Sequence, residues 1–432
     1  MNTLNNFSKI TARTITDAAS QFGTPLYLYD EKLILERCLA CTSMPYAYGH
    51  VVRYAMKANS NRTILKLITD AGLHLDASSL NEVLRAKLAG IASDKIMLTT
   101  QETLDGNERS KLEELLLDGL KYNACSLHQL QLVGDFAAKN NIDIGIRIHP
   151  GVGSGESATR NTGDDYSCFG IHLSDLKEVN SYAASKGMKF KHIHVHIGSG
   201  ADTTMWRKNI DLELKIIEDN FPDADTVSFG GGLKEARMPE EHAADVALLG
   251  SYAKMRVEEF FDRTGRKLKV EIEPGTYIVA NSGYAITRLI DKKKTARTNF
   301  IITDGGMEIN SRPLLYGSKH PVYIVSSDGN RVVSSEFNPS GFNFEAVIAG
   351  KCCESGDCQT LDMDGHAVAR AMSEPLIGDI VVIGGVGAYC SSMAPYNYNS
   401  HVQAAEVLYT QAGDLELIRK RQTLEQMLEN EI

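Results

Sequence analysis

The sequence predicts an α/β chain in which a (β/α)8 TIM-type barrel is followed by a second, mostly β domain. Two observations predict the barrel. Eight short apolar runs alternate with seven helix-like stretches, and together they span about 230 residues, as in most such barrels. A third observation predicts the second domain, because long helical patterns disappear after Glu273-Pro274-Gly275. A doubly wound open sheet is the alternative architecture, but eight strands at this spacing favour the barrel.

The predicted barrel strands are short runs rich in apolar and β-branched residues. They lie near 51–56, 73–77, 95–99, 121–125, 143–148, 190–197, 226–229 and 268–273. The stretches between them carry apolar residues at three- and four-residue spacing, which is typical of amphipathic helices. These helices lie near 61–71, 80–89, 108–118, 127–139, 173–186, 204–219 and 241–264.

Segments on both sides of the alternation predict the second domain. A proline-led strand at 24–30 comes first, and because it precedes the alternation we expect it to join this domain. No long helical pattern returns before about Thr423. The strands expected after Gly275 are 277–280, 285–290, 300–303, 321–326, 331–335, 344–349 and 379–384. We therefore divide the chain into a barrel at 33–280 and a β domain formed by 1–32 and 281–432.

Composition narrows the functional class. A net charge of −10 argues against non-specific binding to nucleic acid or to acidic membranes. No apolar run approaches the roughly 20 residues of a membrane span, and the polar first twenty residues lack a signal core, so we expect a cytoplasmic protein. Eight cysteines in 432 residues do not form a disulfide framework. Cys352, Cys353 and Cys358 cluster without the second pair of a zinc pattern, so no metal site is expected.

Candidate catalytic groups follow the ends of five predicted barrel strands. They are Lys57 after the first strand, Asp76 at the second, His196 and Ser199 after the sixth, Gly230-Gly231-Gly232 after the seventh and Glu273 after the eighth. In barrel enzymes the active site lies at the carboxyl ends of the strands. The five strand ends therefore predict one shared site.

These residue types suit an aldehyde cofactor that carries a phosphate. A desolvated lysine forms a Schiff base, and glycines let backbone N–H groups approach a phosphate. An acid can pair with a protonated pyridine nitrogen, which completes the equipment of a pyridoxal phosphate (PLP) site. Each group alone has a simpler interpretation: Lys57 as a surface lysine, the glycines as a turn, and His196 as a core histidine. Their combined order favours the site.

The motifs resemble those of the fold type III PLP-dependent decarboxylases, from Phe22 to about Tyr409. The motifs that carry the resemblance are Tyr54-Ala55-Met56-Lys57-Ala58-Asn59, His194-Val195-His196-Ile197-Gly198-Ser199, Gly230-Gly231-Gly232, Glu273-Pro274-Gly275, Arg312-Pro313-Leu314-Leu315-Tyr316, Cys353-Glu354-Ser355-Gly356-Asp357 and Gly387-Ala388-Tyr389. The Arg312 and Cys353 motifs favour the diaminopimelate branch over the ornithine branch. The fold that the resemblance implies is an alanine racemase-like barrel with the decarboxylase β domain.

The resemblance also implies a role for each matching residue. Lys57 would carry the cofactor as an imine, and Asp76 would support it. His196 would stack on the pyridine ring, and Glu273 would pair with the ring nitrogen. The residues implied at the phosphate are Ser199, Gly230, Gly231, Gly232, Gly275 and Tyr389. Cys353 would donate the proton that replaces CO2.

The resemblance implies a substrate with a distal carboxylate, bound by Arg312, Tyr316, Glu354 and Tyr389. The implied reaction is decarboxylation of meso-diaminopimelate to L-lysine, in a homodimer whose partner chain supplies Cys353 and Glu354. Three departures from the family pattern are Thr276 in place of arginine, Cys390 in place of glycine and Cys168 in place of lysine. The alternatives that stay open are decarboxylation of a related D-amino acid or siderophore amino acid, a racemase, and a non-catalytic PLP-binding homologue.

Overall fold

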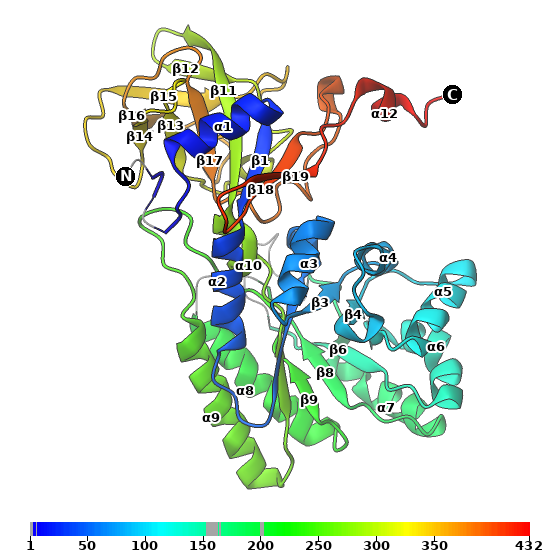
Figure 1. Cartoon of the computed structure of the whole chain (residues 1–432). Helices are drawn as coiled ribbons and strands as arrows, with labels where there is room; N and C mark the ends of the chain where they lie inside the picture. Colours follow the sequence, from blue (N-terminus) through cyan, green and yellow to red (C-terminus); the bar gives the residue numbers. More distant parts are fainter. Residues whose placement is uncertain (1–2, 6, 153–162, 164–165, 199–202) are drawn as a thin grey trace. The chain divides into compact units, whose positions relative to one another are not determined.

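The computed structural model of the chain describes residues 3–5, 7–152, 163, 166–198 and 203–432 (Figure 1). It divides into two compact units, each assembled from separate stretches of sequence. One, here called the barrel unit, comprises Arg37–Lys234 and Ala243–Tyr277. The other, here called the β unit, comprises Met1–Glu36, Glu235–His242 and Ile278–Ile432.

The barrel unit contains a closed ring of parallel strands. The ring consists of β2 (His50–Ala55), β3 (His74–Ala77), β4 (Ile96–Thr99), β5 (Lys121–Ala124), β6 (Gly145–His149), β8 (His192–Val195), β9 (Thr226–Ser228) and β10 (Lys269–Ile272). Each strand pairs with the next, and β10 pairs with β2 to close the ring. The short strand β7 (Ile171–His172) is an additional partner of β6. The predicted barrel is confirmed, and the open doubly wound sheet was the wrong alternative.

Helices connect the barrel strands (Figure 1). They are α3 (Arg62–Asp70), α4 (Leu80–Leu88), α5 (Gly106–Leu117), α6 (Leu127–Asn140), α7 (Leu176–Ser185), α8 (Thr203–Asn220) and α9 (Val246–Thr264). Polar caps fix several starts: the side chains of Asn61, Ser79, Ser126 and Asp245 each accept a hydrogen bond from a backbone N–H of the first turn. Within the described part of the chain, no helix has the length and apolar character needed to span a membrane.

A layer of polar side chains crosses the barrel interior. Arg53 Nη2 donates to Glu271 Oε1 at 3.1 Å, and Glu271 Oε2 lies 3.3 Å from His192 Nε2. His192 Nδ1 lies 2.8 Å from Asn123 Oδ1. Gly145 on β6 makes room for this contact, because a Cβ there would lie 2.2 Å from Asn123 Oδ1. Side chains from four strands are therefore joined to one another.

The β unit contains a ten-stranded sheet. Its strands are β1 (Leu26–Asp30), β11 (Gly283–Lys294), β12 (Asn299–Thr303), β13 (Val322–Val325), β14 (Val332–Ser335), β15 (Phe344–Ala349), β16 (Arg370–Met372), β17 (Ile380–Gly384), β18 (Ala405–Tyr409) and β19 (Leu415–Arg419). β1 pairs antiparallel with β11 and parallel with β18. The strand that precedes the barrel in sequence thus lies in this sheet, as its position predicted.

Helix α1 (Ala12–Phe22) covers one face of this sheet. Its buried residues pack against alternate residues of five strands, as expected when one strand face is turned toward a core. These core residues are Ala12, Ile15, Ala18 and Ala19 of α1 with Leu26, Leu28, Tyr284, Ile286, Tyr323, Val325, Ile380, Val382, Ala405 and Val407. The remaining helices are α2 (Glu31–Thr42), α10 (Thr276–Val279), α11 (Arg312–Tyr316) and α12 (Leu424–Leu428).

The sequence-based assignment was wrong at one expected strand and missed helix α1 and the strands β16, β18 and β19. Residues 277–280, expected as a strand, form α10 and the start of a 3-10 turn. Their β-forming side chains are buried, and Ser282 Oγ donates to Val279 O at 2.7 Å, so tertiary packing overrides local propensity here. Helix α1 was not predicted, although Thr11 and Thr14 form a capping box at its start.

We predict that Glu271→Gln lowers the free energy of unfolding by about 3 kcal/mol or more, because it leaves the Arg53 guanidinium buried without its carboxylate. Urea unfolding at pH 7 measures this change.

The control is Glu258→Gln on α9, which removes an exposed ion pair with Lys254 and should cost less than about 1 kcal/mol. Equal losses in the two variants would contradict a structural role for the buried pair.

Candidate active site

The structure brings the predicted groups of the barrel unit to the carboxyl ends of its strands. Lys57 lies in a 3-10 turn (Met56–Ala58) directly after β2, and Asp76 lies in β3. His196 follows β8, and Glu273 follows β10. Residues 230–232 begin two residues after the end of β9. The charges of Lys57 and Glu273 both act on Asp76 and on His196, so these groups lie near one another.

Glu273 is held as an anion. Ser228 Oγ donates to its Oε1 at 2.7 Å, and His194 Nε2 lies 3.0 Å from its Oε2. Burial favours the protonated acid, but contacts with His194 and Ser228 outweigh burial and lower the pKa of Glu273. Burial lowers the pKa of His194, so at neutral pH this ring is an uncharged donor. One buried negative charge is therefore fixed between two neutral groups.

His196 is a neutral ring of fixed orientation. Burial lowers its pKa well below the usual value, and the charges of Arg147 and Lys57 lower it further. The backbone N–H of Gly231 donates to His196 Nδ1 at 3.3 Å, so Nδ1 carries no proton. The imidazole thus offers a flat uncharged face.

The glycine loop after β9 requires glycine for steric reasons. A Cβ on Gly230 would lie 2.6 Å from the carbonyl oxygen of Val195, and the residue has a left-handed φ of +68°. A Cβ on Gly231 would lie 2.3 Å from the carbonyl oxygen of Glu273. The loop backbone therefore packs directly on the backbones that follow β8 and β10.

Asp76 and Lys57 differ in exposure. Asp76 is buried, and burial followed by the Glu273 charge raises its pKa well above the usual value. Within the described residues, its Oδ1 has no hydrogen-bond partner. Lys57 is exposed, so its amine is accessible to a ligand.

Sequence reasoning missed three groups of this cluster: Arg147, His194 and Ser228. Arg147 lies on β6, is 8% exposed, and has no hydrogen-bond partner at Nε or Nη2 among the described residues. Its charge acts on both Asp76 and His196. An arginine inside a predicted buried strand is itself a signal of function, because charged residues are seldom buried without a reason.

In the β unit, α11 carries Arg312 at its first position. The guanidinium carbon lies 5.5 Å from the ring centre of Tyr316 and 5.9 Å from that of Tyr389. Arg312 Nη2 donates to Ser318 Oγ at 3.2 Å. Tyr389 has a φ of +57°, which is rare for a bulky side chain and typical of functional sites. Three of the four predicted substrate residues thus form one cluster.

Cys353 and Glu354 are both exposed. The backbone N–H of Cys353 donates to Asn399 Oδ1 at 2.8 Å, and Tyr398 Oη donates to Glu354 Oε2 at 3.0 Å. Hydrogen bonds from the Gly356 backbone and from Tyr398 lower the pKa of Glu354. The structure therefore presents a thiol and a carboxylate side by side on one supported loop.

Ser199 and Gly275 are two further predicted cofactor residues. Ser199 lies outside the described residues. Gly275 is buried and immediately precedes α10.

Within the described residues, two groups have metal-ligand atoms close together. They are Glu308, Cys352 and Asp357, and Asp362, Asp364 and His366, each with atoms within 4.8 Å. In the first, Asp357 already accepts the backbone N–H groups of Met307 and Cys352. In the second, Asp362 accepts those of Asp364 and His366. Both carboxylates are explained as supports of their loops.

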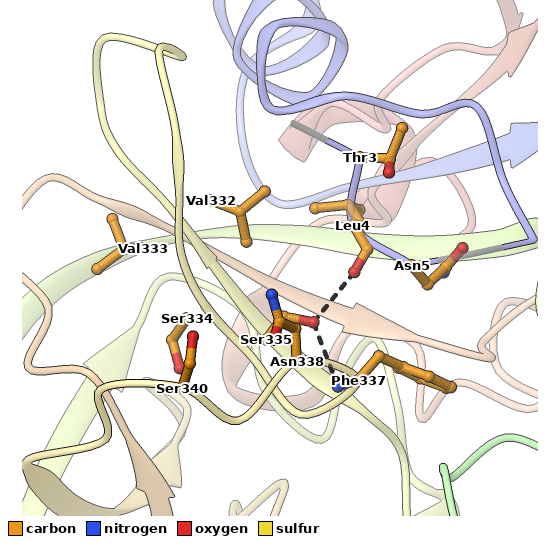
Figure 2. Close-up of a pocket in the computed structure, with 10 residues that line it drawn as sticks. All are labelled: Thr3, Leu4, Asn5, Val332, Val333, Ser334, Ser335, Phe337, Asn338 and Ser340. Atoms are coloured by element: carbon orange, nitrogen blue, oxygen red, sulfur yellow. Dashed lines mark hydrogen bonds between the residues drawn. The ribbon is translucent and has the colours of Figure 1, made fainter. Parts of the chain in front are cut away.

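The β unit contains a pocket of about 280 Å³. Figure 2 shows the residues that line it. Segments Thr3–Asn5 and 332–340 line it, mainly with small polar and apolar side chains. It contains none of the predicted site residues.

Comparisons with known proteins find relatives along nearly the whole chain. Residues 34–280 match the family model for the pyridoxal binding domain of pyridoxal-dependent decarboxylases. The chain is 32% identical over 423 residues to a diaminopimelate decarboxylase of Escherichia coli strain K12, covering 98% of this chain and 97% of that protein.

Solved structures of diaminopimelate decarboxylases also resemble this chain. A crystal structure of a diaminopimelate decarboxylase matches with a TM-score of 0.87 at 32% identity, covering 97% of this chain and 96% of that one. The Helicobacter pylori diaminopimelate decarboxylase, complexed with L-lysine, matches with a TM-score of 0.79 at 27% identity, covering 96% of this chain and 98% of that one.

The charge states in the barrel cluster predict opposite effects of pH on two variants. Because the pKa of Glu273 is lowered on folding, its ionisation stabilises the protein above about pH 4.3. This contribution is lost as the pH falls through the folded-state pKa. Glu273→Gln should therefore be less stable than the wild type at pH 7, by about 2 kcal/mol, and the gap should narrow in acid.

Asp76→Asn is the matched control. The pKa of Asp76 is raised on folding, so its stabilising contribution is present in acid and is lost as the pH rises through the folded-state pKa. This variant should gain stability relative to the wild type as the pH rises. Urea unfolding of dialysed protein between pH 3 and 7 measures both gaps, and parallel curves would contradict the assigned charge states.

Proposed function

The chain belongs to the pyridoxal-dependent decarboxylase family, and we propose that it converts meso-diaminopimelate to L-lysine and CO2. One observation carries the proposal. A cluster of Lys57, His196 and Glu273 at the carboxyl end of the barrel lies in a chain 32% identical, over nearly its full length, to a diaminopimelate decarboxylase. The enzyme is a carboxy-lyase, and its cofactor is pyridoxal 5′-phosphate.

The described residues fit this cofactor. Backbone packing at Gly230 and Gly231 excludes side chains from the loop, so a phosphate can approach the loop backbone closely. The neutral ring of His196 suits stacking on an aromatic ring, and the Glu273 anion suits a protonated pyridine nitrogen. The exposed Lys57 amine suits covalent attachment to the aldehyde. We assign Ser199, Gly232, Gly275 and Tyr389 to the phosphate on the family resemblance alone.

Bound PLP supplies an electron sink for the negative charge that is left when CO2 departs. The protein's own groups support this chemistry. Glu273 would pair with the protonated pyridine nitrogen of the cofactor, because His194 and Ser228 hold its carboxylate ionised. His196 would stack on the pyridine ring, and Asp76 would support the end of the cofactor that is bound to Lys57. Cys353 donates the proton that takes the place of CO2.

The β unit is proposed to recognise the substrate. A carboxylate to be lost should not be stabilised by a strong cation, because that would favour the ground state. Arg312 therefore binds the distal carboxylate, with Tyr316 and Tyr389 adding hydroxyl donors. Glu354 binds the distal ammonium. This arrangement suits diaminopimelate and suits ornithine poorly, because ornithine has no distal carboxylate.

We also propose that the protein is a cytoplasmic homodimer in lysine biosynthesis, and that each site takes Cys353 and Glu354 from the partner chain. A two-fold interface repeats one contact twice, so a single loop can complete both sites. Small-molecule amino acids are its partners, and neither nucleic acid nor membrane is expected to be one.

The test of function is CO2 release by the purified, PLP-loaded protein. We expect release from meso-diaminopimelate with stoichiometric lysine, and none from Lys57→Ala. Borohydride reduction followed by peptide mass spectrometry should place a pyridoxyl group on Lys57.

A panel with ornithine, D-lysine and D-ornithine separates this function from the D-amino acid alternative. CO2 from a member of the panel, but not from meso-diaminopimelate, would contradict the substrate while preserving the reaction class. An unlabelled Lys57 would contradict the cofactor assignment.

The shared site predicts complementation between two inactive variants. Mixing Lys57→Ala with Cys353→Ala chains should restore up to about a quarter of wild-type activity, since half of randomly paired dimers are mixed and each has one intact site. Subunit exchange is verified separately by mass-tagged chains. Complete exchange without recovered activity would assign both residues to one chain.

A further inference from the structure

The segment after β17 contacts three basic side chains of the β unit. Arg237 Nε donates to the carbonyl oxygen of Gly385 at 2.9 Å. His320 Nδ1 lies 2.9 Å from the carbonyl oxygen of Gly384. Four residues further on, Tyr389 lies against the Arg312 guanidinium. Residues 384–389 therefore contact Arg237, His320 and Arg312.

Arg237 reaches this cluster from a distant part of the sequence. It lies in Glu235–His242, which follows the glycine loop in sequence but folds with the β unit. Glu241 Oε2 accepts the backbone N–H groups of Arg237 and Met238, at 2.8 and 3.2 Å. Asn281 Nδ2 donates to the carbonyl oxygen of Ala236 at 2.7 Å. The backbone on both sides of Arg237 is thus held in place.

The side chain of Arg237 is held equally firmly. It is 7% exposed, and its Cγ and Cδ pack against Gly385, where a Cβ would lie 2.9 Å from each. Gly385 also has a left-handed φ of +68°, so a larger residue is disfavoured there twice over. The aliphatic part and Nε are therefore fixed on Gly385, which sets the position of the guanidinium group.

Arg237 and Arg312 act on the same two neighbours. Burial lowers the pKa of His320 well below its usual value, and the charges of Arg237 and Arg312 lower it further. Burial raises the pKa of Cys390 to about 11, although both arginines oppose the rise. His320 is therefore neutral, and the two buried arginines both lie near His320 and Cys390.

We propose that Arg237 is a specificity-determining residue that binds, together with Arg312, the carboxylate at the end of the substrate that does not react. The inference rests on the proposed function and names a second residue of its substrate site. A guanidinium binds a carboxylate through two parallel hydrogen bonds, which a lysine cannot reproduce. A carboxylate placed near two guanidinium groups is attracted by both.

This arrangement selects for a carboxylate rather than for chain length. L-lysine and cadaverine differ only by one carboxylate, so their binding to the PLP-loaded protein isolates the contribution of the arginines. We expect lysine to bind the wild type at least about tenfold more tightly than cadaverine, as measured by titration calorimetry. Arg237→Gln should reduce this preference by at least about tenfold, with cadaverine affinity nearly unchanged. Arg312→Gln is the reference variant and should do the same.

Arg288→Gln is the matched control. Arg288 also donates to a glycine carbonyl, that of Gly378 at 3.0 Å, and has no assigned role in binding. It should keep the wild-type preference. Arg237→Lys keeps a cation and similar packing on Gly385, and should keep part of the preference if Arg237→Gln fails to fold.

Each outcome decides the inference. Wild-type protein that binds lysine no better than cadaverine, or Arg237 variants that lose affinity for both equally, would overturn it. The assay does not require turnover. A protein that leaves diaminopimelate unreacted but loses its lysine preference in Arg237→Gln would refute the proposed function and retain the carboxylate site.

Discussion

The ion pair between Arg53 and Glu271 is the interaction on which the barrel unit depends, because it fixes which strand faces point inward. Side chains alternate along a strand, so residues two apart share a face. Glu271 and His192 therefore place Glu273 and His194 on the same interior side, nearer the carboxyl ends. The pair formed by Glu271 and His192 is structural, and Glu273, which pairs with His194, is assigned to the cofactor. Because side chains two residues apart share a strand face, the residues that stabilise the barrel interior also orient the residues assigned to the cofactor.

Burial and hydrogen bonding together determine the charge states of the groups at the carboxyl ends of the barrel strands. Burial neutralises His194 and His196 and disfavours an ionised Asp76, while hydrogen bonds keep Glu273 negative. A pyridine ring needs a negative partner at its nitrogen and an uncharged neighbour on its face. The pattern meets both requirements before any ligand binds, so little reorganisation is needed on binding. The packed loop at Gly231 adds a rigid backbone on one side of the cluster.

Much of this arrangement is readable from the sequence, because barrel strands leave a strong periodic signal and their ends mark the site. Lys57, His196 and Glu273 were found in this way. Arg147 was missed because it lies in the middle of a strand, whereas the candidate groups were chosen at strand ends. The segment 277–280 was misassigned because its β-forming side chains are buried in a helical turn. Arg237 left no local signal, since its partner Gly385 is 148 residues away.

The position of Arg237 has a consequence for how specificity is encoded. Apart from Tyr389, the groups assigned to the cofactor belong to the barrel unit, and those assigned to the substrate belong to the β unit. Glu235–His242 is the exception in sequence, because it lies between β9 and α9 yet folds with the β unit. Its anchors are carbonyl and amide groups of the backbone together with Glu241 and Asn281, none of which is assigned to the cofactor. On the proposed role of Arg237, substitutions in this segment are expected to alter recognition of the distal carboxylate while leaving the Glu273 network intact.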